Sequence, residues 1–169
     1  NLSFSAFDTP HKLNKLLDIL QQVPGSALVY CRNRKFTREI ATWLQQQGIS
    51  ASYYHAGLSS EDRSLRQEVW IRSQIRVMAC TNAFGMGIDK PDVRVVVHIG
   101  APDSLEDYYQ EAGRAGRDGN RSYAVLLYTH AELKELEKSV EKKYPPLAVI
   151  RDVYQSVANY LQLPVGSGE

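Results

Sequence analysis

The hydrophobic pattern of this chain alternates between short apolar runs and longer segments with apolar residues at helical spacing. The apolar runs have few polar interruptions, as expected for strands that are buried on both faces of a parallel sheet. We predict strands over residues 27–31, 50–54, 75–80, 93–99 and 123–128. We predict amphipathic helices before and between them, over residues 10–20, 36–47, 59–72 and 104–112. This alternation indicates an α/β fold, in which right-handed crossovers build a mostly parallel sheet flanked by helices.

Residues with known capping preferences mark several helix boundaries. Thr9 and Pro10 have the residue types preferred at the cap and at the first position of a helix. Ser59, followed three residues later by Asp62, has the form of a capping box. Gly48 follows the second predicted helix, where a left-handed residue commonly ends a helix.

The pattern changes near Thr129, after the last predicted strand. Leu133 and Leu136 then recur at helical spacing among charged residues, and Pro145 and Pro146 separate this helix from another over residues 149–161. We therefore predict an α/β domain over residues 1–129 and a short helical appendage over residues 130–169.

Composition and charge limit the possible partners of the chain. The 169 residues include 20 Lys and Arg and 19 Asp and Glu, for a net charge of +1, so contacts with nucleic acid must come from local groups of basic residues. No apolar stretch reaches the roughly 18–20 residues of a membrane span, and residues 1–9 lack the form of a signal peptide. We expect a soluble, intracellular, cytoplasmic protein without a membrane partner, associated with the nucleoid if it is bacterial. Because the first residue is Asn1 rather than Met, we also expect a piece of a longer protein.

A zinc site is one interpretation of the side chains at the predicted strand ends. Cys31, His55, Cys80 and His98 all fall at such positions. Structural zinc sites usually use closely spaced ligand pairs, which this sequence lacks, and small cysteines of buried strands are ordinarily core residues. We therefore predict no metal site.

Polar, small or basic residues follow several predicted strands, at the edge where parallel α/β sheets bind ligands. These segments are residues 32–35, 55–57, 81–89 and 100–102. In residues 81–89, two glycines flank Met86 and Asp89 follows. Such a loop can present backbone amides to an anion while the carboxylate accepts a hydrogen bond from a hydroxyl such as that of a ribose. Equally, the glycines can serve only to allow a turn with positive φ angles.

Residues 110–119 contain Arg114 and Arg117 among three glycines, directly after a predicted helix. Guanidinium groups on an adaptable loop suit a phosphoryl group in transfer, and a solvated basic turn is the alternative. The interposed glycines favour the functional interpretation. The sequence has no Gly-x-x-x-x-Gly-Lys-Ser/Thr loop, so these residues cannot hold ATP phosphates and Mg²⁺ by themselves. We therefore expect a partner lobe that holds the nucleotide.

Together these segments make residues 1–128 resemble the second RecA-like lobe of superfamily 2 helicases, and specifically the RecQ family of DNA helicases. The segments that carry the resemblance are residues 28–31 (motif IV), 54–58 (the H-A-G segment), 79–92 (motif V) and 109–119 (motif VI). The resemblance implies a RecA-like three-layer fold. It also implies the C-terminal motor lobe of an ATP-dependent 3′–5′ DNA helicase of DNA repair or recombination.

The resemblance implies roles for residues near the nucleotide. Arg117 resembles the arginine finger and Arg114 a further γ-phosphate contact. Gly87, Asp89 and Gln110 would lie at the nucleotide, with Asp89 at the ribose. ATP and Mg²⁺ would be held mainly by the first RecA-like lobe of the same polypeptide.

The resemblance also implies contacts with single-stranded or duplex DNA. Thr81, Arg32, Asn33 and His55 would lie near the phosphates of the tracked strand, although Asn33 stands where the family usually has a hydroxyl residue. An RNA helicase or duplex translocase would share the fold, but the RecQ-like residues of motifs V and VI argue against both. A non-enzymatic nucleic-acid-binding module is a further alternative, and an upstream Walker loop in the reading frame would argue against it.

The end of the chain departs from the family. Many RecQ proteins continue into a helical platform that holds zinc with four cysteines, and this chain has no cysteine after Cys80. The zinc site is therefore absent or lies beyond the chain. The helices predicted between residues 131 and 161 would then begin a zinc-free platform.

Overall fold

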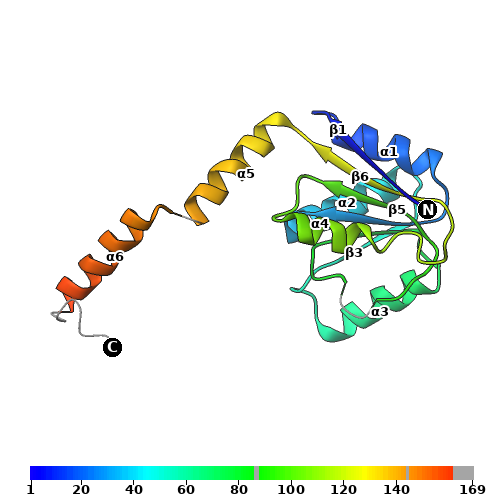
Figure 1. Cartoon of the computed structure of the whole chain (residues 1–169). Coiled ribbons are helices and arrows are strands. Elements are labelled where there is room, and N and C mark those ends of the chain that lie inside the picture. Colours follow the sequence, from blue (N-terminus) through cyan, green and yellow to red (C-terminus); the bar gives the residue numbers. More distant parts are fainter. Residues whose placement is uncertain (86–87, 144, 162–169) are drawn as a thin grey trace. The chain divides into compact units, whose positions relative to one another are not determined.

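The computed structural model describes residues 1–85, 88–143 and 145–161. Within these residues, six strands form one parallel sheet in the order β1-β6-β5-β2-β4-β3, with helices packed on it (Figure 1). The strands are β1 Leu2–Asp8, β2 Ser26–Cys31, β3 Ala51–Tyr54, β4 Val77–Cys80, β5 Val93–Ile99 and β6 Ser122–Tyr128. The helices are α1 Lys12–Gln22, α2 Arg34–Gln46, α3 Ser60–Ile71, α4 Leu105–Ala112, α5 His130–Lys143 and α6 Leu147–Tyr160. The predicted α/β fold with a parallel sheet is confirmed.

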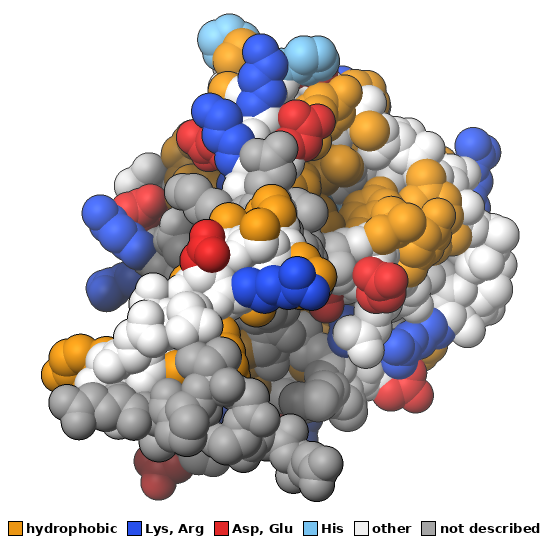
Figure 2. All heavy atoms as spheres, turned by 60° about the vertical axis from the view of Figure 1, so that its left-hand side comes forward, with side chains coloured by type: hydrophobic (Ala, Val, Ile, Leu, Met, Phe, Trp, Pro, Cys, Tyr) orange, Lys and Arg blue, Asp and Glu red, His pale blue; other side chains and the backbone are white. Residues whose placement is uncertain are grey.

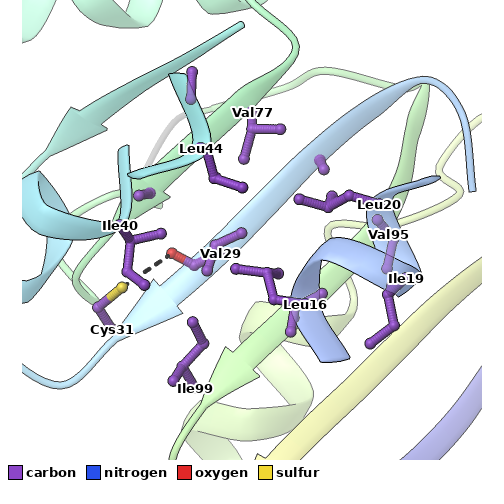
Figure 3. Close-up of a cluster of buried hydrophobic side chains, with 14 of the residues drawn as sticks. Leu16, Ile19, Leu20, Val29, Cys31, Ile40, Leu44, Val77, Val95 and Ile99 are labelled. Carbon is purple, nitrogen blue, oxygen red and sulfur yellow. Dashed lines mark hydrogen bonds between the residues drawn. The ribbon is translucent and has the colours of Figure 1, made fainter. Parts of the chain in front are cut away.

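Two hydrophobic cores cover the two faces of the sheet, because successive strand residues point to opposite faces. On one face, Val29 packs with Leu16 of α1 and Leu44 of α2 (Figure 3). On the other face, Leu28 packs with Trp70 of α3 and with further buried residues after β4. The helices α1 and α3 therefore lie on opposite sides of the sheet (Figure 1), which gives three layers.

The edge strand β1 is absent from the sequence-based prediction. It pairs with β6 from Leu2 opposite Ser122 to Asp8 opposite Tyr128. Nearly all of its residues are exposed, so β1 has no continuous apolar run of the kind that identifies the inner strands. Its signal is the alternation of apolar and polar residues from Leu2 to Ala6, which is typical of a strand that is not buried on both faces.

The start of α1 differs from the prediction. The helix begins at Lys12, with His11 at the cap position, rather than at Pro10. The backbone N–H of Thr9 donates to the carbonyl of Tyr128 at 2.9 Å, which continues the pairing of β1 with β6. The Thr9 hydroxyl oxygen accepts from the backbone N–H of His11 at 3.2 Å, before the helix begins, so Thr9 does not cap α1.

Two other helix boundaries are confirmed. The Ser59 hydroxyl oxygen accepts a hydrogen bond from the backbone N–H of Asp62 at 3.0 Å at the start of α3. Gly48 has a φ of +76° directly after α2, in the left-handed region that favours glycine.

The chain divides into two compact units, Asn1–Leu133 and the residues from Lys134 onward. The first turn of α5 belongs to the first unit, because Glu132 forms an ion pair with Lys12 of α1 and His130 lies 2.8 Å from the carboxylate of Asp8. The identification of the second unit as the start of a RecQ-type platform stays a prediction. No described helix is both long enough and apolar enough to cross a membrane.

Candidate functional site

A pocket of about 250 Å³ lies at the carboxyl ends of β2, β4 and β5. The helix α2 follows β2 on one face of the sheet, and α4 follows β5 on the other. Ligands of parallel α/β sheets bind where consecutive crossovers diverge in this way. The polar side chains that line the pocket are Tyr30, Arg32, Thr81, Asn82, His98, Asp103, Asp107 and Glu111.

Two predicted DNA contacts lie in this lining. Arg32 is exposed directly after β2, and Thr81 is half-buried directly after β4. The neighbouring strands β2 and β4 bring these residues together, as the rule on parallel strand ends predicts.

The other two predicted DNA contacts, Asn33 and His55, lie outside the lining of the pocket. The Asn33 side-chain oxygen caps α2 by accepting from the backbone N–H of Phe36 at 2.8 Å. The Nδ1 atom of His55 accepts from the backbone N–H of Gly57 at 3.2 Å, which leaves Nε2 as the donor of the neutral ring. Burial, and then the charge of Arg34, lower the pKa of His55.

The charge around the pocket is mixed in sign. Among the described lining residues, Arg32 is the single Lys or Arg, whereas Asp103, Asp107 and Glu111 are acidic. Figure 2 likewise shows basic and acidic side chains interspersed on the face that it displays. Phosphate contacts would therefore depend on individual basic side chains rather than on a broad basic surface.

Arg114 is buried, with 9% of its surface exposed. Its Nη1 atom donates to the carbonyl of Gly85 at 2.6 Å, while the Tyr30 hydroxyl donates to the carbonyl of Phe84 at 2.9 Å. Burial raises the pKa of Tyr30 well above its ordinary value, so the hydroxyl keeps the proton that it donates. A side chain at position 85 would collide with the Arg114 guanidinium, which explains the glycine there. Two neighbouring carbonyls of motif V are thus bound from different motifs, that of Phe84 by Tyr30 of motif IV and that of Gly85 by Arg114 of motif VI.

Arg117 has a different environment from Arg114. Its Nη1 atom donates to the carbonyl of Ile88 and to Oδ1 of Asp89, each at 3.1 Å, and the Arg117 and Asp89 side chains are 39% and 81% exposed. Exposed ion pairs contribute little free energy, so Arg117 can leave Asp89 at small cost. Gln110 is exposed on α4, and Gly87 lies outside the described residues. The structure therefore brings Arg117 and Asp89 together on the surface.

Asp118 anchors the end of motif VI to β5. The Nη2 atom of Arg94 donates to both carboxylate oxygens of Asp118, each at 2.7 Å. The hydrogen bonds from Arg94, followed by those from Asn120, lower the pKa of Asp118 to about 2. The loop that carries Arg117 is thereby held at its far end.

We expect the Arg94–Asp118 pair to make stability depend on pH in the acid range. A carboxyl group with a lower pKa in the folded chain than its unfolded value of about 3.9 stabilises the fold above about pH 4, and this contribution is lost as the pH falls towards about 2. Asp118→Asn should therefore flatten the pH dependence of the free energy of unfolding between about pH 4 and pH 2. Urea unfolding at a series of pH values measures both slopes, with substitution of an exposed residue of α4, Glu106→Gln, as control. Equal slopes for the wild type and Asp118→Asn would contradict the prediction.

A buried pair, His98 and Glu111, was not foreseen as part of the site. Nε2 of His98 lies 2.8 Å from Oε2 of Glu111. The His98 ring stacks on Tyr30, with 5.1 Å between the ring centroids, and Tyr108 lies tilted against it at 4.9 Å. The available signal was a histidine that follows three consecutive valines of β5, with a glutamate on the helix that follows.

The side chains considered as zinc ligands do not converge. Cys31 and Cys80 belong to different hydrophobic cores, on opposite faces of the sheet. Cys31 lies among the apolar side chains of Figure 3, where burial raises the pKa of its thiol to about 12. Burial likewise raises the pKa of Cys80 well above its ordinary value. No group of three or more His, Cys, Asp or Glu within the described residues could hold a metal ion.

Comparison with known proteins places these residues in a family. The family model described as "Helicase conserved C-terminal domain" matches residues 10–119. The chain is 39% identical over 150 residues to "Probable ATP-dependent DNA helicase RecS" of Bacillus subtilis, an alignment that covers 88% of this chain and 30% of that protein. It is 43% identical over 138 residues to "RecQ-like DNA helicase blm-1" of Caenorhabditis elegans, covering 79% of this chain and 14% of that protein.

A solved structure supports the same assignment. The E. coli DEAD-box protein SrmB, crystallised with regulator of ribonuclease activity A, matches with a TM-score of 0.69 and 26% identity over 80% of this chain and 83% of that chain. The predicted RecA-like fold is confirmed. The chain spans less than a third of the length of either curated relative. The family match extends from α1 through the arginines of motif VI, so the chain belongs to the helicase conserved C-terminal domain family, and its relatives include RecQ-like helicases.

Proposed function

We propose that this chain is the C-terminal motor lobe of an ATP-dependent DNA helicase that moves 3′ to 5′ along one strand. The observation that carries the proposal is the exposed pair formed by Arg117 of motif VI and Asp89 of motif V, 3.1 Å apart. The pair offers a guanidinium for phosphoryl oxygens and a carboxylate for ribose hydroxyls at one place on the surface. The rest of the nucleotide site belongs to the first RecA-like lobe of the same polypeptide.

The donors and acceptors of this chain suit ATP held mainly by another lobe. Asp89 would accept hydrogen bonds from the ribose, Gln110 would contact the nucleotide with Gly87, and Arg117 would exchange Asp89 for oxygens of the γ-phosphoryl group. Mg²⁺ bound by the first lobe would neutralise phosphate charge. Arg114, held on the carbonyl of Gly85, would support this arrangement and contribute a further positive charge.

The DNA strand would lie at the carboxyl ends of the sheet. Thr81 and Arg32 would contact phosphates from the pocket lining. His55 would donate from Nε2, and Asn33 from its side-chain nitrogen, because the Asn33 oxygen caps α2. Phosphate contacts of this kind position a strand without reading its sequence, as a translocating motor requires.

The test uses the whole protein that contains this chain. ATP turnover is measured alone, with single-stranded DNA and with single-stranded RNA, and unwinding is measured on duplexes with a 3′ or a 5′ overhang. The proposal requires DNA-stimulated turnover and unwinding from the 3′ overhang. Stimulation by RNA alone would identify an RNA helicase, and DNA binding without turnover would identify a non-enzymatic module.

We expect the isolated chain of 169 residues to show no ATP turnover on single-stranded DNA, because it carries the arginines without a phosphate-binding loop. Steady-state hydrolysis by purified chain, compared with the whole protein, measures this. Arg117→Ala in the isolated chain is the control for contaminating ATPases, since a contaminant is indifferent to that substitution. Turnover that depends on Arg117 in the isolated chain would contradict the prediction.

A further inference from the structure

The hydrogen bond between His98 and Glu111 joins β5 to α4 in the interior of the lobe. The two residues are 2% and 7% exposed, and their partner atoms lie 2.8 Å apart. A carboxylate can only accept, so with Glu111 ionised, Nε2 of His98 carries the donated proton. A buried carboxylate without this partner would be costly, so the bond strongly constrains the side chain of Glu111.

Glu111 lies in the last turn of α4, immediately before the arginines of motif VI. The helix ends at Ala112, and the backbone N–H of Arg114 donates to the carbonyl of Glu111 at 3.2 Å. The side chain of Glu111 is thus fixed to the sheet while its carbonyl holds the turn that leads to Arg117. Glu111 therefore links His98 of the sheet to the start of the arginine loop, the segment 113–117 that carries Arg114 and Arg117.

The same buried group reaches motif V and the pocket. Tyr30, stacked on His98, donates to the carbonyl of Phe84, and Arg114 donates to the carbonyl of the next residue, Gly85. Tyr30, His98 and Glu111 also line the pocket that contains Thr81. A strand bound in the pocket would thus contact the residues that orient the arginine loop.

We propose that Glu111 is a positioning residue, which through its hydrogen bond to His98 holds Arg114 and Arg117 in the orientation that phosphoryl transfer requires. Glu111 acts through the last turn of α4 and touches no reacting atom. The inference rests on the proposed function, because it concerns the geometry of the same arginines.

The test compares Glu111→Ala with Glu111→Gln in the whole protein. Misplacement of catalytic groups by about 1 Å can cost about 10²-fold in rate, so Glu111→Ala should lower kcat for DNA-stimulated ATP hydrolysis by about 10- to 100-fold. With DNA at saturating concentration, the KM for ATP should change by less than about twofold, because the ground-state contacts with the nucleotide remain. In Glu111→Gln the amide oxygen still accepts from His98, so kcat should return to within about threefold of the wild type. Glu106→Ala, exposed on the same helix, is the matched control and should keep wild-type kcat.

Three results would overturn the proposal. One is wild-type kcat in a folded Glu111→Ala protein. Another is an equal loss in Glu111→Gln and Glu111→Ala with the fold intact, which would show that the charge itself acts. The third is a fall in kcat that only follows the folded fraction measured by circular dichroism, which would show a purely structural role.

A second variant keeps the test decisive if Glu111→Ala does not fold. Glu111→Asp keeps the carboxylate but shortens the side chain by one methylene group, so the bond to His98 and the position of the last turn of α4 cannot both be kept. It should lower kcat several-fold at unchanged KM for ATP, and an unchanged kcat in the folded variant would overturn the proposal. Failure of the proposed function is recognised separately, since the wild-type protein would then show no DNA-stimulated turnover at all.

Discussion

Replacing Arg117 with alanine in the whole protein is expected to lower kcat for DNA-stimulated ATP hydrolysis by about 10³-fold or more, with little change in the KM for ATP. An arginine finger meets charge that develops mainly in the transition state, so its loss raises the barrier without weakening ground-state binding. The guanidinium is partly exposed, and within the described residues its side chain bonds only to Ile88 and Asp89, so removing it leaves the core intact. Steady-state kinetics with saturating single-stranded DNA measure both constants.

Three further variants identify the role of Arg117. Arg117→Lys should rescue poorly, because lysine keeps the charge but loses the planar fork of donors. Asp89→Ala should chiefly raise the KM for ATP, because a ribose contact is similar before and during phosphoryl transfer. Arg121→Ala, an exposed arginine that follows motif VI, is the control and should keep kcat. If Arg117→Ala kept kcat and only weakened DNA binding, the arginines of motif VI would form a clamp for DNA phosphates instead.

The sequence predicted the inner strands well because burial on both faces leaves a continuous apolar run. Such runs identify β2, β4 and β5, each of which is buried along nearly its whole length. The edge strand β1 was not predicted, because an exposed strand has no continuous apolar run. The predicted start of α1 was wrong because Thr9 continues the pairing with Tyr128, which is distant in sequence, so that the chain turns into the helix only at Lys12. Local patterns therefore predict elements that are buried uniformly along their length. They fail where a contact between residues distant in sequence determines where an element begins.

The same distinction applies to the site. The rule on strand ends placed Arg32 and Thr81 correctly at one edge, because it depends only on strand direction. The different environments of Arg114 and Arg117 do not follow from their spacing, since they depend on the approach of Gly85 and Asp89 from another loop. The pairing of His98 with Glu111 likewise requires the rotation of α4 about its axis, which no residue pattern specifies.

The second large effect expected is on stability: Phe84→Ala should lower the free energy of unfolding by about 3–5 kcal/mol. Phe84 is fully buried, although it lies in the loop of motif V, and it packs edge-on against Tyr54 and Trp70 with 4.7 and 5.4 Å between ring centroids. Truncation removes this apolar contact and leaves a cavity that the surrounding rings cannot fill. Urea unfolding of the variant and the wild type measures the difference.

Two control variants test whether the lost free energy of unfolding comes from the burial of Phe84 or from the removal of any aromatic ring. Phe84→Leu keeps much of the apolar volume and should lose about half as much free energy as the alanine variant. Phe4→Ala removes a ring that is 50% exposed on the edge strand β1, so its loss should stay below about 1.5 kcal/mol. Equal losses for Phe84→Ala and Phe4→Ala would show that motif V is not packed into the core. A large loss at Phe84 would instead show that this loop is anchored by its aromatic residue, so that the carbonyls of Phe84 and Gly85 are fixed acceptors for Tyr30 and Arg114.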